Sequence, residues 1–239
     1  MPVYYTAQEA TTVKQELHFD LPIHFLMALC GGFLGAYAIF NRMAVFANAQ
    51  TANLIELIGD LVGRDFTEGM IRLGAFLTFA FGIVLSVFLE QRLHRKLKYL
   101  EIFVELGVVF LVGFFPAGLH PILAVYPIFF IAALQWCVFP GADGFTAANV
   151  FSTNNVKQTV ASFTEYLMER RKNPEKAAKT ARKARFFGGT LLSFHSGVLC
   201  GYIGSLFLGL KSIWLCMIPL LSVLLLLFTE DRKRGGHLS

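Results

Sequence analysis

Six long apolar runs leave few folds open to this chain of 239 residues. They cover about residues 22–40, 71–91, 99–115, 119–140, 186–209 and 212–228. Most approach the roughly 20 residues that an α-helix needs to cross about 30 Å of hydrocarbon. Lipid offers no hydrogen bonds to the backbone, so apolar segments of this kind cross a membrane as helices. With 55% hydrophobic residues, the chain is predicted to be an all-α integral membrane protein with six transmembrane helices.

Basic residues are distributed unevenly between the two sides that these runs define. If the runs cross in turn, 17 of the 21 lysines and arginines fall on one side and 4 on the other. The positive-inside rule then predicts that both termini lie in the cytoplasm. The net charge of +5 also fits attraction to anionic lipid. The aromatic residues lie in the apolar runs rather than among the basic residues, so we expect membrane lipid as a partner and no nucleic acid.

The second half of the chain repeats features of the first. Gln50-Thr51 follows the first run and Gln158-Thr159 follows the fourth. The second and fifth runs each carry small residues at every fourth position, which lets another helix backbone approach closely. These stripes are Gly74, Thr78, Gly82 and Ser86 in the second run, and Gly189, Ser193, Gly197 and Gly201 in the fifth. Three runs per half is an odd number, so the pattern predicts a 3+3 inverted repeat with interrupted helices. The alternative is that any two sets of three apolar helices look alike.

This repeat divides the chain into four parts. Residues 1–21 form a cytoplasmic N-terminal segment and residues 22–118 the first three-helix repeat. Residues 119–228 form the second repeat with a basic cytoplasmic connection, and residues 229–239 a cytoplasmic tail. In the connection, Asn173-Pro174-Glu175 is typical of a helix start. The lysines that follow it are interpreted as a solvated face, with attraction to an anion as the alternative.

Amides and hydroxyls are concentrated in the segments that follow the first and fourth runs. Thr and Asn favour helix starts, and a helix start carries a partial positive charge that binds anions or polarised groups. Two inverted half-helices would direct two such ends toward one central point. The alternative is that both segments are solvated loops at the membrane surfaces. The candidate solute-binding residues are Gln50, Thr51, Asn53, Thr153, Asn155, Gln158 and Thr159.

Polar residues inside the apolar runs are candidates for coupling or gating, because a charge within the membrane is costly unless it is paired or functional. Glu105 lies deep in the third run, whereas Glu101 is close to Lys96 and Lys98 and is expected at the interface. The other candidates are His195 within the fifth run, Gln135 within the fourth run, and Arg72 at the edge of the second.

The sequence contains no hydrolytic, phosphate-binding or dinucleotide-binding motif, so an enzyme is not expected. The four cysteines lie in apolar runs with no CxxC or Cys/His spacing typical of a metal site. We interpret them as buried, reduced side chains and expect neither a metal nor a cofactor.

Three sequence elements resemble the YoaK-like bacterial membrane proteins, a family of unknown function. They are Gly31-Gly32-Phe33, the string Gln50-Thr51-Ala52-Asn53, and Ser152-Thr153 followed by Gln158-Thr159. The resemblance covers about residues 20–228 and implies six spans in the bacterial inner membrane. This chain departs from the family pattern at Leu34, where the family has Asp, and at Ala52, where it has Gly.

Together these features predict a small-solute transporter or channel. Its site would lie between the two polar segments and would take a solute that is small and polar or anionic. The alternative is a non-transporting membrane scaffold or assembly protein, in which the small-residue stripes serve helix or subunit contacts. A homodimer is compatible with either function.

Overall fold

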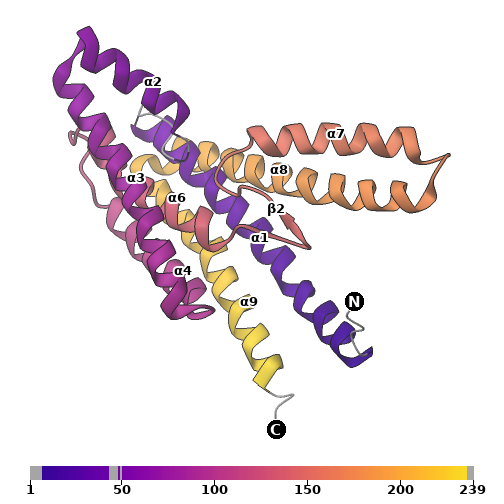
Figure 1. Ribbon diagram of the computed structural model, residues 1–239. Coiled ribbons are helices and arrows are strands. Elements are labelled where there is room, and N and C mark those ends of the chain that lie inside the picture. The colour runs from indigo at the N-terminus through magenta and orange to yellow at the C-terminus, as the bar shows by residue number, and fades with distance from the viewer. Residues whose placement is uncertain (1–6, 43–47, 49, 236–239) are drawn as a thin grey trace.

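The computed structural model of the protein describes residues 7–42, 48 and 50–235, which are predominantly helical (Figure 1). Five long helices dominate the fold: α1 (Ala7–Arg42), α3 (Phe66–Leu93), α4 (Lys96–Val112), α8 (Pro174–Leu208) and α9 (Met217–Gly235). The shorter helices are α2 (Thr51–Gly59), α5 (Pro121–Ala124), α6 (Tyr126–Val138) and α7 (Thr153–Glu169). A π-helical turn, η1 (Asp60–Arg64), follows α2, and a 3-10 segment, η2 (Gly209–Cys216), joins α8 to α9. A small hairpin pairs β1 (Gly141–Ala142) with β2 (Phe145–Thr146).

Three helical stretches are long and apolar enough to cross a membrane. They are residues 19–42 of α1, all of α3, and the continuous stretch Pro174–Lys233, which contains α8, η2 and most of α9. The runs predicted at 99–115 and 119–140 form shorter helices. α4 has 17 residues, and the second of these runs is interrupted at Val125 between α5 and α6. The all-α membrane class predicted from the sequence is therefore confirmed.

α1 is the central helix of the bundle. In its most apolar window 72% of the residues are buried inside the protein, against 22% for α3 and 33% for the stretch from Pro174. α8, α9 and η2 pack along it, and β1 and α6 also contact it. Large side chains such as Met27, Leu34 and Tyr37 are completely buried. α1 is therefore surrounded by other parts of the chain.

α8 packs on α1 at very short range. A methyl group on Gly32 of α1 would lie 1.9 Å from the carbonyl oxygen of Phe194, and one on Gly197 of α8 would lie 2.0 Å from that of Leu29. Both distances are far below van der Waals contact, so only the absence of a Cβ atom allows the two backbones to touch. The small-residue stripe of the fifth apolar run therefore faces the first run.

α3 packs on α6 in a similar way. A methyl group on Gly82 would lie 2.8 Å from both Cβ of Ala133 and the carbonyl oxygen of Phe130. Nearer the start of α3, Gly74 lies against the hydroxyl of Tyr126. The stripe of the second run therefore faces the fourth run. Both stripes act in helix–helix packing, as predicted for small residues in membrane helices.

Candidate functional site

Asn48, six residues beyond the end of α1, lies beside the middle of the apolar stretch of that helix. α1 ends at Arg42, yet the side-chain amide of Asn48 donates a 2.5 Å hydrogen bond to the carbonyl oxygen of Gly31. Gly31 precedes Arg42 by eleven residues, which is about 16 Å along a helix. It also stands at the middle of the 24-residue apolar stretch of α1. α2 therefore starts beside the centre of α1, and in Figure 1 it leads from there to the end of the bundle where α3 begins.

The segment after the hairpin reaches the same residue. A methyl group on Gly31 would lie 2.3 Å from the main-chain oxygen of Asn149 and 3.0 Å from Cα of Val150. α7 begins three residues later, at Thr153, and extends to the right in Figure 1 beside α8. Both polar segments thus contact α1 at one glycine, from which α2 and α7 lead away.

Helices α2 and α7 begin with similar residues. Gln50 and Ser152 are the N-cap residues of α2 and α7, and neither side chain makes a capping hydrogen bond. The next residues, Thr51 and Thr153, are exposed, whereas Asn53 and Asn155 are buried. The structural counterpart of the Gln50-Thr51-Ala52-Asn53 string is therefore Ser152-Thr153-Asn154-Asn155.

This register corrects the sequence prediction, which paired Gln50-Thr51 with Gln158-Thr159. The latter residues lie in the second turn of α7 and do not open it. The hydroxyl of Thr159 donates to the carbonyl of Asn155 at 2.7 Å, and its methyl group lies near Gly188 of α8. Thr159 thus serves the contact between α7 and α8.

Four buried amides share one hydrogen-bonding pattern, and two of them, Asn48 and Gln135, donate to carbonyls of α1. Each donates its N–H group to a main-chain carbonyl, which only accepts hydrogen bonds, so the position of each amide nitrogen is fixed. The four side-chain oxygens have no hydrogen-bond partner among the described residues, and each residue is at most 1% exposed. An unsatisfied buried polar group costs about 1–3 kcal/mol. The amides and the carbonyls they contact are Asn48 with Gly31, Gln135 with Met27, Asn149 with Phe139, and Asn155 with Ala148.

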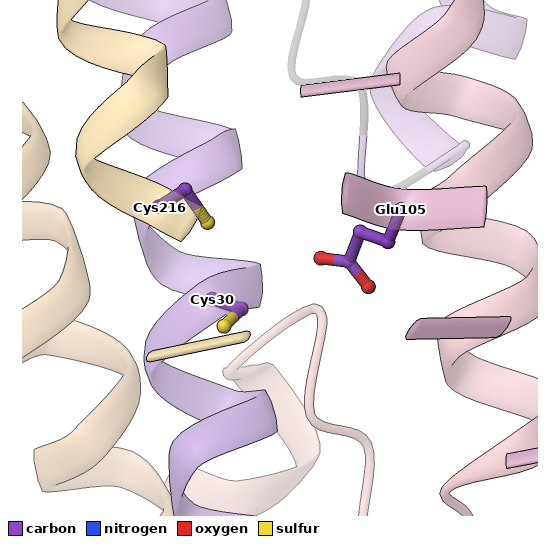
Figure 2. A group of neighbouring side chains, drawn as sticks. All are labelled: Cys30, Glu105 and Cys216. Atoms are coloured by element: carbon purple, nitrogen blue, oxygen red, sulfur yellow. The ribbon is translucent and has the colours of Figure 1, made fainter. Parts of the chain in front are cut away.

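Glu105 points toward the same part of α1 from α4 (Figure 2). Its carboxylate, the sulfur of Cys30 on α1 and the sulfur of Cys216 at the end of η2 lie within 4.8 Å of one another. All three side chains are completely buried. Glu101, one turn earlier on α4, is also buried by the protein, at 2% exposed. The cysteines were missed as site residues because their separation in the sequence gives no motif.

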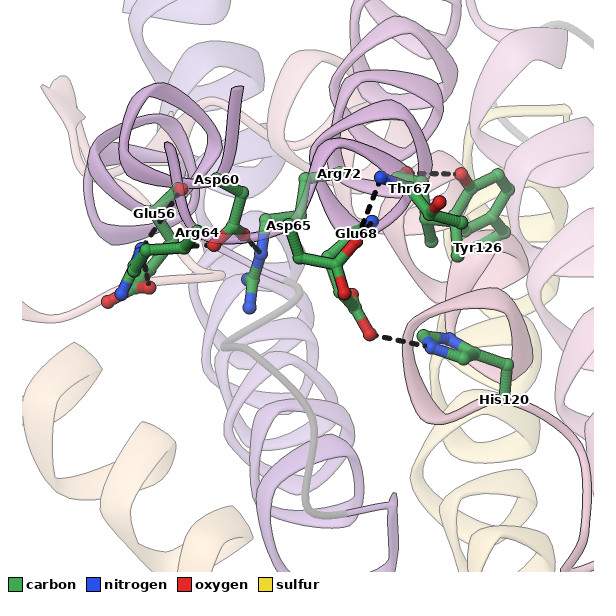
Figure 3. A network of polar contacts seen from close by, with 10 residues as sticks. Glu56, Asp60, Arg64, Asp65, Thr67, Glu68, Arg72, His120 and Tyr126 are labelled. Atoms are coloured by element: carbon green, nitrogen blue, oxygen red, sulfur yellow. Dashed lines mark hydrogen bonds and ion pairs between the residues drawn. The ribbon is translucent and has the colours of Figure 1, made fainter. Parts of the chain in front are cut away.

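Arg72 lies in a polar network between α2 and α3 (Figure 3). Its Nε atom is 2.6 Å from a carboxylate oxygen of Asp60, which also pairs with Arg64 at 3.2 Å. Asp65 caps the start of α3 by accepting hydrogen bonds from the main-chain N–H groups of Thr67 and Glu68. This network fixes the turn from α2 into α3, and Arg72 is engaged there rather than at the centre.

The two histidines of the membrane helices differ from the prediction. His195 is exposed, and its Nδ1 atom lies 2.9 Å from the Leu191 carbonyl of its own helix. His24 is 1% exposed, lies 3.1 Å from the hydroxyl of Thr190 and stacks on Phe186. His24 was missed because an isolated histidine near the start of an apolar run carries no motif.

An open cleft of about 540 Å³ lies between the hairpin and the polar start of α8. Arg182 lines it and pairs with the carboxylate of Asp143. The positive charge of Arg182 is matched by this carboxylate, and Lys179 also lines the cleft.

The fold and this site define a helical membrane protein in which two polar segments return to the middle of the most buried helix. The chain belongs to the DUF1275 family, described as proteins of unknown function, whose family model matches residues 23–226. The match covers the helices from α1 to α9 and is consistent with the YoaK-like resemblance of the sequence. Searches among curated proteins and among solved structures gave no match.

Proposed function

We propose that this protein is a small-solute transporter or channel of the bacterial inner membrane. The observation that carries the proposal is the meeting of two polar segments at Gly31, halfway along the apolar stretch of α1. Transporters built from inverted repeats bind their substrates near the membrane midplane, where interrupted helices begin. The centre is closed in this conformation, because the amides around Gly31 are buried. Solute access therefore requires α2 or α7 to move relative to α1.

The proposal includes six membrane-crossing segments in a 3+3 inverted repeat, with both termini cytoplasmic. The two halves make equivalent helix–helix contacts, and this similarity supports the arrangement. α8, the second long helix of the later half, packs by its glycines on α1, and α3 packs by its glycines on α6. The last long helix of each half packs on a helix from the first apolar run of the other half: α4 packs on α6, and α9 packs on α1. Interchange of the halves maps each contact onto its counterpart.

The chemistry of the centre favours a small polar solute that donates hydrogen bonds. The four amide oxygens without partners among the described residues are acceptors, and the carboxylate of Glu105 lies beside Cys30, next to Gly31. An isolated anion would be repelled by these groups. The uncapped N–H groups at the starts of α2 and α7 are donors, so a zwitterion would use both kinds of group. We therefore propose small neutral or zwitterionic solutes, such as amino acids, ahead of simple anions.

A pair of neighbouring asparagines tests this proposal. Asn155→Ala removes a buried acceptor, whereas Asn154→Ala makes the same change at the adjacent exposed position of α7. Proteoliposomes would be tested for uptake of glycine, alanine, ammonium, potassium, nitrate and formate, with thermal unfolding measured in parallel. A bound solute raises the unfolding temperature according to its concentration relative to Kd. We expect at least one polar solute to stabilise and cross with the wild type and Asn154→Ala, and to do neither with Asn155→Ala.

Two outcomes would contradict the proposal. Uptake that is equal in the two variants would mean that the buried amides do not line the route. Absence of flux and of thermal stabilisation for every probe would favour a protein that does not transport.

The alternative, a membrane scaffold or assembly protein, is favoured by the outer face of α7. Val156, Val160, Phe163 and Leu167 recur along one side of this helix and are all at least 43% exposed. Such an apolar face fits lipid or a second copy of the chain. A homodimer lost on Phe163→Ser, combined with absence of flux, would support the scaffold.

A further inference from the structure

We propose that Cys30, Cys216 and Glu105 bind one divalent transition-metal ion, with zinc as the best fit. The ion would join α1, α4 and the junction of η2 with α9. This site adjoins the amide centre, because Cys30 precedes Gly31 on α1, but metal binding by these three side chains can be tested whether or not the protein transports a solute.

The three side chains have the geometry of an unfilled ligand set. Figure 2 shows the three side chains, Cys30, Cys216 and Glu105, grouped together on three different elements. Their ligand atoms lie within 4.8 Å of one another. Bond lengths of about 2.3 Å to sulfur and 2.0 Å to oxygen in a tetrahedron place ligand atoms about 3.5–3.8 Å apart. Binding would therefore require the side chains to close by about 1 Å, which rotation of their χ angles can supply.

Among the described residues, Glu105 has another buried carboxyl group, that of Glu101, one turn away and forms no ion pair with a cation. It is 0% exposed, and neither of its oxygens has a hydrogen-bond partner there. The basic residues at the near end of α4 pair elsewhere, Lys98 with Asp20 and Arg95 with Glu230 and Asp231. A buried carboxylate is costly unless it is paired or binds a metal. A divalent ion would supply the missing positive charge.

The donor set selects the metal. Thiolates favour zinc and other borderline or soft ions, whereas magnesium and calcium prefer sites made only of oxygen ligands. Each thiol would lose its proton to solvent as its sulfur binds, so metal binding would release protons. Three protein ligands leave the fourth tetrahedral position for water or for Glu101, the next acidic residue on the same face of α4.

The test uses the full-length, reduced protein in detergent, with Co²⁺ as a spectroscopic probe and Zn²⁺ as a competitor. We expect one equivalent of Co²⁺ to give the thiolate-to-metal charge-transfer absorption of a two-sulfur site, and Zn²⁺ to abolish it. Loss of a group that only orients a metal ligand weakens binding about 10–100-fold. Loss of a ligand itself, in Cys216→Ser or Glu105→Gln, should therefore raise the Kd for zinc at least about 100-fold.

The two other cysteines provide matched controls. Cys137→Ser and Cys200→Ser change the same chemical group outside the cluster and should leave zinc affinity within about twofold of the wild type. If Cys216→Ser does not fold, Glu105→Gln still decides the question, because it preserves side-chain volume and removes only the charge.

Three results would overturn the proposal. The first is absence of stoichiometric Co²⁺ binding by the reduced wild type. The second is equal loss of zinc affinity in the cluster variants and the control variants. The third is a Cys30–Cys216 disulfide in the purified protein that, once reduced, leaves thiols unable to bind either metal.

Discussion

Gly197→Ala should open the tightest helix contact in the protein. The new methyl group would lie 2.0 Å from the carbonyl oxygen of Leu29, 2.8 Å from its carbonyl carbon and 2.9 Å from the nitrogen of Phe33. All three are backbone atoms of α1, so no side-chain rotation relieves the overlap. Ordinary contact begins at 3.4 Å, so α8 must retreat from α1 by about 1.4 Å along the shortest of these lines.

The expected cost follows from the nature of that retreat. Overpacking a tight interior costs typically about 1–3 kcal/mol. Because rigid backbone surrounds Gly197, we expect the upper end, about 3 kcal/mol of lost unfolding free energy. Gly107→Ala is the matched control, since Gly107 lies inside α4 and a methyl group there would have no described atom within 4 Å. The free energy of unfolding of this control should be unchanged or up to about 1 kcal/mol higher, because alanine is more stable than glycine inside a helix.

Equilibrium unfolding in mixed detergent micelles, followed by circular dichroism, measures both variants. Gly32→Ala requires the same helix separation from the other side, since its methyl group would meet the carbonyl of Phe194. The double variant should therefore cost less than the sum of the single variants, with a coupling of about 1 kcal/mol or more. If Gly197→Ala unfolds within about 0.5 kcal/mol of the wild type, the close approach of α1 and α8 is refuted.

Two further predictions concern the ends of helices and the hairpin. Arg72→Gln leaves the mostly buried Asp60 carboxylate with only its 3.2 Å ion pair to Arg64, so we expect the free energy of unfolding to fall by about 2 kcal/mol. The control is Arg92→Gln at an exposed position, whose free energy of unfolding should stay within about 0.5 kcal/mol of the wild type. An undiminished stability of Arg72→Gln would show that the network of Figure 3 does not hold the turn. Gly144→Ala places a side chain at φ +78° in the turn between β1 and β2, which should cost about 1–2 kcal/mol in the same unfolding assay. Gly118 has open space around it and no positive φ, so Gly118→Ala should leave the stability unchanged. Equal losses of stability in the two variants would contradict a left-handed conformation at Gly144.

Local sequence patterns predicted the long helices well. The first and second apolar runs, at 22–40 and 71–91, fall within the apolar part of α1 and within α3. The small-residue stripes of the second and fifth runs lie at helix contacts, because a repeat of four positions defines one face of a helix whatever the partner is. The partner of each face was not predictable, since it lies in the other half of the chain.

The candidate site was less accessible to sequence reasoning. Glu105 was identified because a carboxyl group deep in an apolar run is costly wherever it lies. The meeting of Asn48 and Asn149 at Gly31 depends on how far each segment folds back, and no local pattern encodes that distance. The cysteines facing Glu105 lie 186 positions apart (Cys30 and Cys216), so only the packing of α1 with η2 brings them together.

The central position of α1 has a consequence for synthesis of the protein. α1 is synthesised before α8 and α9, which begin at Pro174 and Met217 and pack against it. At about 5–20 residues per second, α8 emerges roughly 8–30 s after α1. During that interval His24 lacks its Thr190 partner, and the carbonyl oxygen of Leu29 lacks the cover that Gly197 of α8 provides. The most buried helix, α1, therefore stays uncovered until α8 and α9 have been made. A ribosome that stalls before α8 would leave α1 without these packing partners.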